Sequence, residues 1–198
     1  MTDPRNRDDE GCDPAQGARK HRAKLEFFEE NARSLERCAN TSEERLAAHG
    51  HLWTRGNGGS ACDAQHVAVE FMYPIIEKRR LLLASALTID AALVTAIDND
   101  TDCSHVFVRQ LELPAHPGDI AIGISTPGSS ANVNRALKRA REMDVLAVGR
   151  DGGRMAELCD RGFIVKSWSI HLIQGTHTLL LHLMWDQMHV AMGADDVI

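Results

Sequence analysis

The chain has 198 residues, of which 43% are hydrophobic and 25% charged, and its formal net charge is -6. This length allows one domain with a substantial core, and the composition is ordinary for a globular protein. The negative charge argues against nucleic acid as a partner. No apolar run reaches the roughly 18 to 20 residues that a membrane-spanning helix needs, so we expect no membrane partner either.

The cysteines point to a reducing compartment. There are 5 of them, scattered and without C-x-x-C spacing, which argues against a disulfide framework or a cysteine-based zinc knuckle. The N-terminus is polar and carries acidic residues, unlike a signal peptide. The cytoplasm is therefore the expected location.

The N-terminal part is expected to be a tail followed by helices. Residues 1–18 are rich in Asp, Arg, Gly and Pro and have no apolar periodicity, which predicts a disordered tail. Residues 19–198 are expected to form a single domain. It opens with a helix whose apolar residues recur three and four apart over 25–39. Thr41 and Ser42, followed by two glutamates, predict a turn and the start of a short second helix.

From residue 51 onward, short apolar runs alternate with helical patterns. This alternation predicts right-handed βαβ crossovers and a parallel sheet covered on both faces. The last pattern, about 170–192, predicts a long helix with a broad apolar face, ended by Gly193. The expected fold class is α/β, a three-layer sandwich with a five-stranded parallel sheet flanked by helices and an N-terminal helical extension. The expected strands are 50–55, 81–87, 119–125, 144–149 and 162–167, and the expected helices between them are 60–74, 90–97, 104–112, 129–142 and 152–159.

Two polar turns follow expected strands, at the sheet edge where ligands of parallel α/β folds bind. The turn at 56–60 is rich in glycine and leads into a helix start, which suits an anion such as phosphate. The turn at 125–132 has four hydroxyl residues within 125–130. Helix capping explains one serine well and four hydroxyl residues less well. We predict that both turns form a single anion site, whose members are Ser60, Ser125, Thr126 and Ser130.

Three titratable residues lie beyond these turns. His66 and Glu70 are four residues apart and therefore share a helix face one turn after the glycines. Such a pair is usually a surface ion pair, but its place behind an anion cradle indicates a base or a metal ligand acting on a phosphorylated molecule. His182, on the last helix, can donate or accept a proton near neutral pH.

Six motifs occur together in this order: Gly56-Asn57-Gly58-Gly59-Ser60, Asp63-Ala64-Gln65-His66, Asn99-Asp100, Gly123-Ile124-Ser125-Thr126-Pro127-Gly128-Ser129-Ser130, Arg150-Asp151-Gly152-Gly153 and Ile173-Gln174-x-x-His177-x-x-x-x-His182. The combination resembles the sugar isomerase (SIS) family and, within it, the phosphoheptose isomerases. The resemblance covers about residues 20–195 and is far more specific than any single glycine turn.

The resemblance implies a ketose–aldose isomerase that converts sedoheptulose 7-phosphate to D-glycero-D-heptose 7-phosphate through an enediol. It implies that Glu70 is the catalytic base and His182 the acid, and that the protein is a homotetramer with one zinc ion per subunit. The implied zinc ligands are His66, Glu70, Gln174 and His182. The implied substrate-binding residues are Asn57, Gly58, Gly59, Glu70, Asn99, Asp100, Ser125, Thr126, Ser130 and Gln174.

Three residues depart from the family pattern. Pro127 stands where a serine is usual and removes one N–H and one hydroxyl from the phosphate cradle. Ser129 replaces a common asparagine, and His171 stands where some members have an aspartate. Two alternatives therefore stay open: an isomerase of a related ketose phosphate, such as an octulose 8-phosphate, and a non-catalytic regulator that binds sugar phosphates. Retention of the acid and base residues favours an enzyme.

The last helix also raises a question of reach. Gln174 and His182 are eight residues apart, so their Cα atoms are separated by about 12 Å along the helix axis. Because zinc binds ligand atoms about 2 Å away, one straight helix could supply both only with stretched side chains. The helix is also apolar nearly all round, which predicts packing against another subunit. We therefore expect a homo-oligomer whose active site contains residues from at least two chains.

Overall fold

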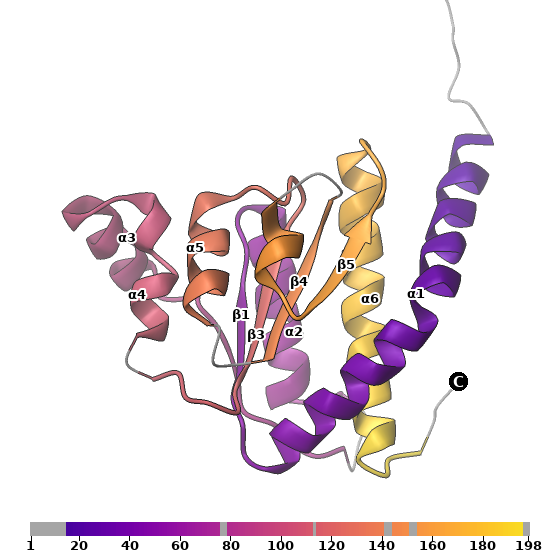
Figure 1. Ribbon diagram of the computed structural model, residues 1–198, viewed down its shortest axis with the longest axis horizontal. Coiled ribbons are helices and arrows are strands. Elements are labelled where there is room, and N and C mark those ends of the chain that lie inside the picture. The colour runs from indigo at the N-terminus through magenta and orange to yellow at the C-terminus, as the bar shows by residue number, and fades with distance from the viewer. Residues whose placement is uncertain (1–14, 76–78, 113, 141–143, 151–153, 196–198) are drawn as a thin grey trace, which may run out of the picture.

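The computed structural model describes residues 15–75, 79–112, 114–140, 144–150 and 154–195. Its centre is a parallel sheet in the strand order β2-β1-β3-β4-β5 (Figure 1). Every residue of β1 and β3 is buried, as expected for strands covered on both faces. The α/β class predicted from the alternating patterns is confirmed. The strands are β1 (Leu52–Arg55), β2 (Ala84–Ala86), β3 (Ile120–Ser125), β4 (Asp144–Arg150) and β5 (Arg161–Val165).

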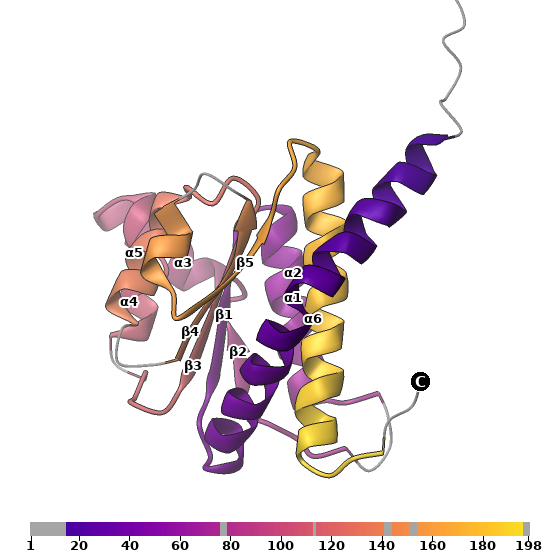
Figure 2. The same cartoon turned by 45° about the vertical axis from the view of Figure 1, so that its right-hand side comes forward.

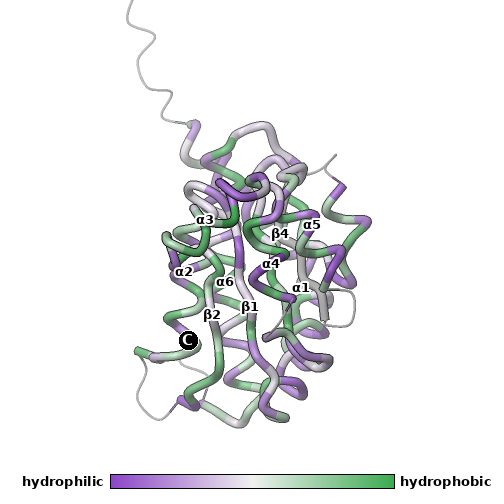
Figure 3. The backbone as a smooth tube through the Cα atoms, turned by 90° about the vertical axis from the view of Figure 1, so that its left-hand side faces the viewer, coloured by the Kyte–Doolittle hydropathy of each residue, from purple (hydrophilic) through white to green (hydrophobic). Residues whose placement is uncertain are grey.

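Helices cover the sheet in two layers (Figure 2). On one side lie α1 (Ala15–Ala47), α2 (Gly59–Met72) and α6 (Ile170–Ala191), with α6 packed against both α1 and α2. On the other side lie α3 (Ala91–Asp100), α4 (Val108–Leu111) and α5 (Ala131–Arg139), with the short 3₁₀ turns η1 (Cys103–His105) and η2 (Arg154–Leu158). Figure 3 views the molecule from the α3 and α4 side, where hydrophobic and hydrophilic segments alternate along the tube.

Alternation along the strands divides the core in two. Leu52 and Ile122 point to the layer of α1, α2 and α6, whereas Trp53 and Ala121 point to the layer of α4 and α5. Among the described residues, no helix is both long enough and apolar enough to cross a membrane.

The N-terminal region differs from the expectation of two helices. α1 runs without a break through residues 41 and 42, because Thr41 bonds back to the carbonyl of Arg37 at 3.0 Å and Ser42 is wholly buried. Tertiary burial thus overrides a local capping signal. α1 also begins at Ala15, inside the stretch expected to be a tail, and residues 1–14 lie outside the described residues.

Smaller differences concern the periphery. The expected helix 104–112 is divided into η1 and α4, and η1 begins where Asp102 accepts a hydrogen bond from the Ser104 N–H. The expected helix 152–159 is the 3₁₀ turn η2 over its described part. β2 is shorter than the apolar run 81–87, and Leu81 and Leu83 are exposed.

Candidate active site

The two predicted turns lie side by side at the carboxyl ends of neighbouring strands. β1 pairs with β3 so that Arg55 lies opposite Gly123. Beyond the strands, Asn57 and Asn132 exchange two hydrogen bonds between their side-chain amides, at 2.8 and 2.9 Å. We call this reciprocal pair the amide bridge. It joins the turn at 56–60, which we call the glycine turn, to the start of α5. Asn132 was not singled out from the sequence, where it reads as one polar residue at a helix start.

The glycine turn has backbone requirements that only glycine meets. Gly58, the N-cap of α2, has φ 54° and ψ -123°, a conformation that L side chains rarely adopt. A Cβ on Gly56 would overlap the main chain of Ser60, and one on Gly59 would lie 2.5 Å from the Gln174 amide. The turn therefore lets α2 start close against the sheet and against α6. No side chain caps α2 at Gly58.

In the turn at 125–132, which we call the serine turn, the N-cap serine does not use its hydroxyl to cap α5. Ser125 is buried at the end of β3, and its Oγ lies 2.9 Å from the Oγ of Ser130. Ser130 occupies the N-cap position of α5, yet its side chain makes no capping hydrogen bond. Gly128, with φ 65°, closes the turn by donating to the Ser125 carbonyl at 3.0 Å. Thr126 is half-buried in the same turn, and Ser60 is buried in the first turn of α2.

The acid and base candidates come together between α2 and α6. The Nε2 atoms of His66 and His182 are 2.7 Å apart, and the Nε2 of His66 lies 3.7 Å from a carboxylate oxygen of Glu70. One imidazole N–H therefore donates a hydrogen bond to the unprotonated nitrogen of the other ring. The Glu70 side chain is 21% exposed, so it is partly withdrawn from water, whereas that of His66 is 46% exposed.

α2 and α6 run side by side in the same direction with matched spacing. Gly59 faces the Gln174 amide, and the Thr178 hydroxyl donates to Asp63 at 3.1 Å. Further along the two helices, His66 faces His182, and the Trp185 indole N–H donates to the Glu70 carbonyl at 2.9 Å. The contacting positions differ by 115 or 116 in each of the hydrogen-bonded pairs. Three of the four expected zinc ligands thus converge within one chain, while Gln174, in the first turns of α6, faces Gly59 at the other end of the helix pair.

Asp63, on α2, lies near two residues of α6, Gln174 and Thr178. Burial raises the pKa of Asp63, and hydrogen bonds from Thr178 and Gln174 oppose that rise. The Asp63 carboxylate therefore lies close to the Gln174 side chain, which faces the glycine turn. The motif containing Asp63 was recognised from the sequence, but this link depends on the register of two helices that are distant in the chain.

The expected metal site has suitable donors but a closed geometry. Imidazole and carboxylate are ordinary zinc ligands. Tetrahedral ligands with bonds of about 2.0–2.1 Å are roughly 3.3 Å apart, whereas the facing histidine nitrogens are 2.7 Å apart. Accordingly, the described part of the chain contains no three His, Cys, Asp or Glu side chains arranged to hold one metal ion. The two rings would have to separate before His66, Glu70 and His182 could bind zinc.

The other expected site residues lie at the rim. Asn99 and Asp100 end α3, where both are exposed and the Asn99 amide donates to Asp100 at 2.9 Å. η1 follows directly, and the thiol of Cys103 lies 3.9 Å from the Asn132 amide nitrogen, so this segment runs beside the start of α5. The departures Pro127, Ser129 and His171 are all exposed. In the Arg150–Gly153 motif, residues 151–153 lie outside the described residues.

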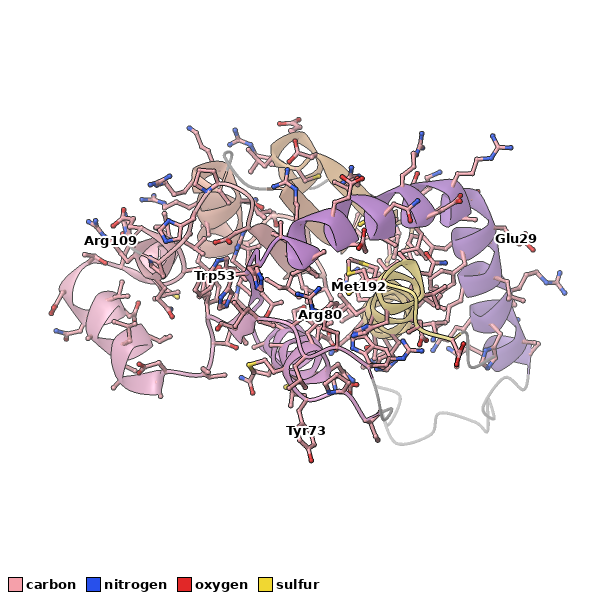
Figure 4. The ribbon with its side chains drawn as sticks, turned by 90° about the horizontal axis from the view of Figure 1, so that it is seen from below. Glu29, Trp53, Tyr73, Arg80, Arg109 and Met192 are labelled. Carbon is pink, nitrogen blue, oxygen red and sulfur yellow. The ribbon has the colours of Figure 1, made fainter. Side chains whose placement is uncertain are left out.

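An exposed apolar surface surrounds the end of α2. Tyr73 is 79% exposed and projects from the molecule (Figure 4). Apolar residues near Tyr73 in the sequence, and two leucines in the segment that leads to β2, are also exposed. We call this set the α2 apolar surface, and its members are Val69, Met72, Tyr73, Ile75, Leu81 and Leu83.

Comparison with known proteins identifies the family of this chain. The sequence profile of the SIS domain family matches residues 18–149. A phosphoheptose isomerase of Desulfovibrio desulfuricans is 46% identical over 161 residues, which cover 80% of this chain and 77% of that protein. The structure of a phosphoheptose isomerase from Neisseria gonorrhoeae superposes with a TM-score of 0.81 at 38% identity, covering 88% of this chain and 95% of the other.

A second solved structure agrees with the first. The phosphoheptose isomerase from Francisella tularensis superposes with a TM-score of 0.84 at 28% identity, covering 89% of this chain and 95% of that one. The resemblance expected from the six motifs is confirmed. The chain belongs to the SIS domain family and, within it, to the phosphoheptose isomerases.

Proposed function

We propose that this protein is a phosphosugar ketose–aldose isomerase that converts sedoheptulose 7-phosphate to D-glycero-D-heptose 7-phosphate. The observation that carries the proposal is the convergence of His66, Glu70 and His182 between α2 and α6. The relatives named phosphoheptose isomerase support the same substrate class.

Isomerisation moves a proton between C1 and C2 of the sugar. Glu70 takes the proton from C1 of the ketose, and the electrons of that C–H bond form the C1–C2 double bond of the enediol. His182 protonates the C2 oxygen as its carbonyl bond opens. Glu70 then returns the proton to C2, while the C1 hydroxyl gives its proton back to His182 and becomes the aldehyde carbonyl. His66, hydrogen-bonded to His182, fixes which nitrogen of His182 carries the proton.

The remote phosphate is the natural anchor for the substrate. Ser125, Thr126 and Ser130 offer hydroxyls at the start of α5, where helix N–H groups favour an anion. Ser60 lies in the first turn of α2, two residues after its N-cap Gly58. Because Ser130 makes no capping bond, its hydroxyl is available to a ligand. Asn57, Gly58, Gly59, Asn99, Asp100 and Gln174 complete the proposed substrate-binding set.

We also propose that zinc binds at His66, Glu70, Gln174 and His182. The ion would polarise the sugar carbonyl when bound. The donor types fit zinc, and separation of the two histidine rings is the movement that binding requires. Metal analysis and calorimetric titration should show one zinc ion per chain in the wild type and loss of binding in His66→Ala. Equal zinc binding by both proteins would remove this part of the proposal.

The proposed assembly is a homotetramer in the cytoplasm, with active sites at subunit interfaces. The α2 apolar surface supports burial against another copy. We expect Tyr73→Glu to lower the mass measured by light scattering. A wild-type monomer with full activity would contradict both the tetramer and the shared site.

The test of the proposed activity is incubation with sedoheptulose 7-phosphate while the aldose product is followed. An octulose 8-phosphate in a parallel reaction tests the related isomerase, for which Pro127 and Ser129 are the motivation. Binding of either sugar phosphate with no turnover would indicate the regulator instead. Turnover that is lost in His182→Ala, with the fold retained by circular dichroism, is the expected result.

A further inference from the structure

Arg55 is the last residue of β1, and its side chain is wholly buried. Its Nε and both terminal nitrogens have no hydrogen-bond partner among the described residues. The terminal nitrogens of the buried Arg79 also make no hydrogen bond, but Arg79 has the carboxylate of Asp186 at 3.2 Å and lies over the Trp185 ring. An unpaired buried charge is costly, so natural proteins rarely keep one without a partner.

Burial lowers the pKa of Arg55 to about 9. The guanidinium therefore still carries its charge near neutral pH. An anion from outside the described chain would supply the partner that this charge lacks.

Strand alternation shows which side of the sheet Arg55 faces. Thr54 faces α2, because its hydroxyl donates to the Ala64 carbonyl at 2.7 Å. Trp53 belongs to the core on the α5 side, so Arg55, two residues later, faces α5 as well. The residue opposite it on β3 is Gly123, and the side chains of Leu137 and Met155 pack closely over that glycine.

The serine turn lies directly beyond this position. Ser125 follows Gly123 by two residues, which places its Cα roughly 8 Å from that of Arg55 for standard strand spacings. That is within reach of an extended arginine side chain. The amide bridge joins the residues just after Arg55 to the first turn of α5. Arg55 thus lies beneath the start of α5, where the serine hydroxyls and the helix N–H groups are all hydrogen-bond donors.

We propose that Arg55 is a specificity-determining residue that supplies the buried countercharge for the phosphate of the ligand. Serine hydroxyls and N–H groups alone would bind a phosphate monoester through uncharged donors, without a positive countercharge. A guanidinium below them adds a charge-assisted interaction and favours the dianion over neutral or singly charged groups. The inference rests on the proposed function only for the identity of the ligand as a sugar phosphate.

The test uses inorganic phosphate as the probe and the full chain as the protein. Calorimetry and thermal unfolding are compared for wild type, Arg55→Met, Arg55→Lys and the control Arg109→Met, an exposed arginine on α4. We expect Arg55→Met to bind phosphate at least tenfold more weakly and to gain little thermal stability from it. Without phosphate, the same variant should unfold at a higher temperature than wild type, because an unpaired buried charge is replaced by an apolar side chain.

The two effects have opposite signs, which a merely structural arginine would not produce. Arg55→Lys keeps the charge and should bind phosphate with intermediate affinity, and it serves as the readout if Arg55→Met does not fold. Equal phosphate affinity in wild type and both variants would overturn the inference, as would wild type that does not bind phosphate. Phosphate binding that depends on Arg55, in a protein that does not turn over sedoheptulose 7-phosphate, would overturn only the proposed substrate.

Discussion

The indole of Trp185 donates its hydrogen bond to the main-chain oxygen of Glu70, not to a side chain. The carbonyls in the last turn of a helix lack intrahelical partners, and here three neighbouring ones are satisfied. The Tyr73 N–H donates to the main-chain carbonyl of Val69 at 2.7 Å, and the Leu82 N–H donates to that of Phe71 at 2.9 Å. The bond from Trp185 satisfies the one between them. α6 therefore fixes the position of the proposed base through its backbone.

Trp185→Phe should test this positioning role, because it removes the indole N–H donor and keeps a smaller aromatic ring in its place. We expect a loss of about 1 kcal/mol in the free energy of unfolding and a lower kcat with little change in KM. Denaturant unfolding and steady-state kinetics measure the two effects. Trp168→Phe, at a site 85% exposed, is the control and should change neither. A Trp185→Phe enzyme with wild-type kcat would limit the residue to a structural role.

Glu70→Gln should abolish most turnover while the fold is retained. The substitution preserves shape and removes the proton acceptor, and positioned proton transfer contributes about 10²–10⁴-fold to rates. The measurement is kcat with sedoheptulose 7-phosphate, and Glu112→Gln, at the exposed residue that follows α4, is the matched control. Near wild-type kcat in correctly folded Glu70→Gln would rule out the proposed base.

The serine turn should control KM. Replacing Ser125 and Thr126 by Ala removes hydrogen bonds to a charged group, which are worth about 1.5–3 kcal/mol, or roughly a ten- to hundredfold rise in KM. Ser129→Ala changes an exposed serine in the same turn and should leave KM near the wild-type value. A sugar phosphate found bound only on another face of the protein would refute the anion site.

Asp63 predicts a dependence of stability on pH. Its pKa is raised in the folded protein, with burial as the main cause, so the folded state holds this proton more tightly than the unfolded state. The contribution of Asp63 to stability is therefore present at low pH and is lost as the pH rises from the unfolded pKa through the folded one. Asp63→Asn should be more stable than wild type at neutral pH, and the difference should shrink as the pH is lowered. A difference independent of pH would show that Asp63 is not the group responsible.

Regular elements could be predicted from the sequence where one pattern dominates. β3 and α6 have nearly the expected bounds, because a continuous apolar run and a long periodic face are local properties. The capping signal at Thr41 and Ser42 was misleading, since burial of Ser42 is decided by packing that the local sequence does not contain.

The site was predicted only in its components. Motifs supplied His66 and His182, but their meeting depends on two helices that lie side by side although their contacting residues are 116 positions apart. Arg55 could not be recognised, because an arginine ending a strand usually reaches solvent. Its burial is decided by packing against neighbouring elements that the local sequence does not contain.

The equal spacing of contacts along α2 and α6 makes the site sensitive to chain length as well as to residue identity. One residue inserted between Thr178 and His182 would turn the rest of α6 by about 100°. His182 would then leave His66, and Trp185 would leave Glu70, although no functional residue had been replaced. Insertions between α2 and α6 do not change this phase. Natural length variation in relatives of this protein should therefore be found in the connecting segments and be absent from the stretch of α6 between Gln174 and Trp185.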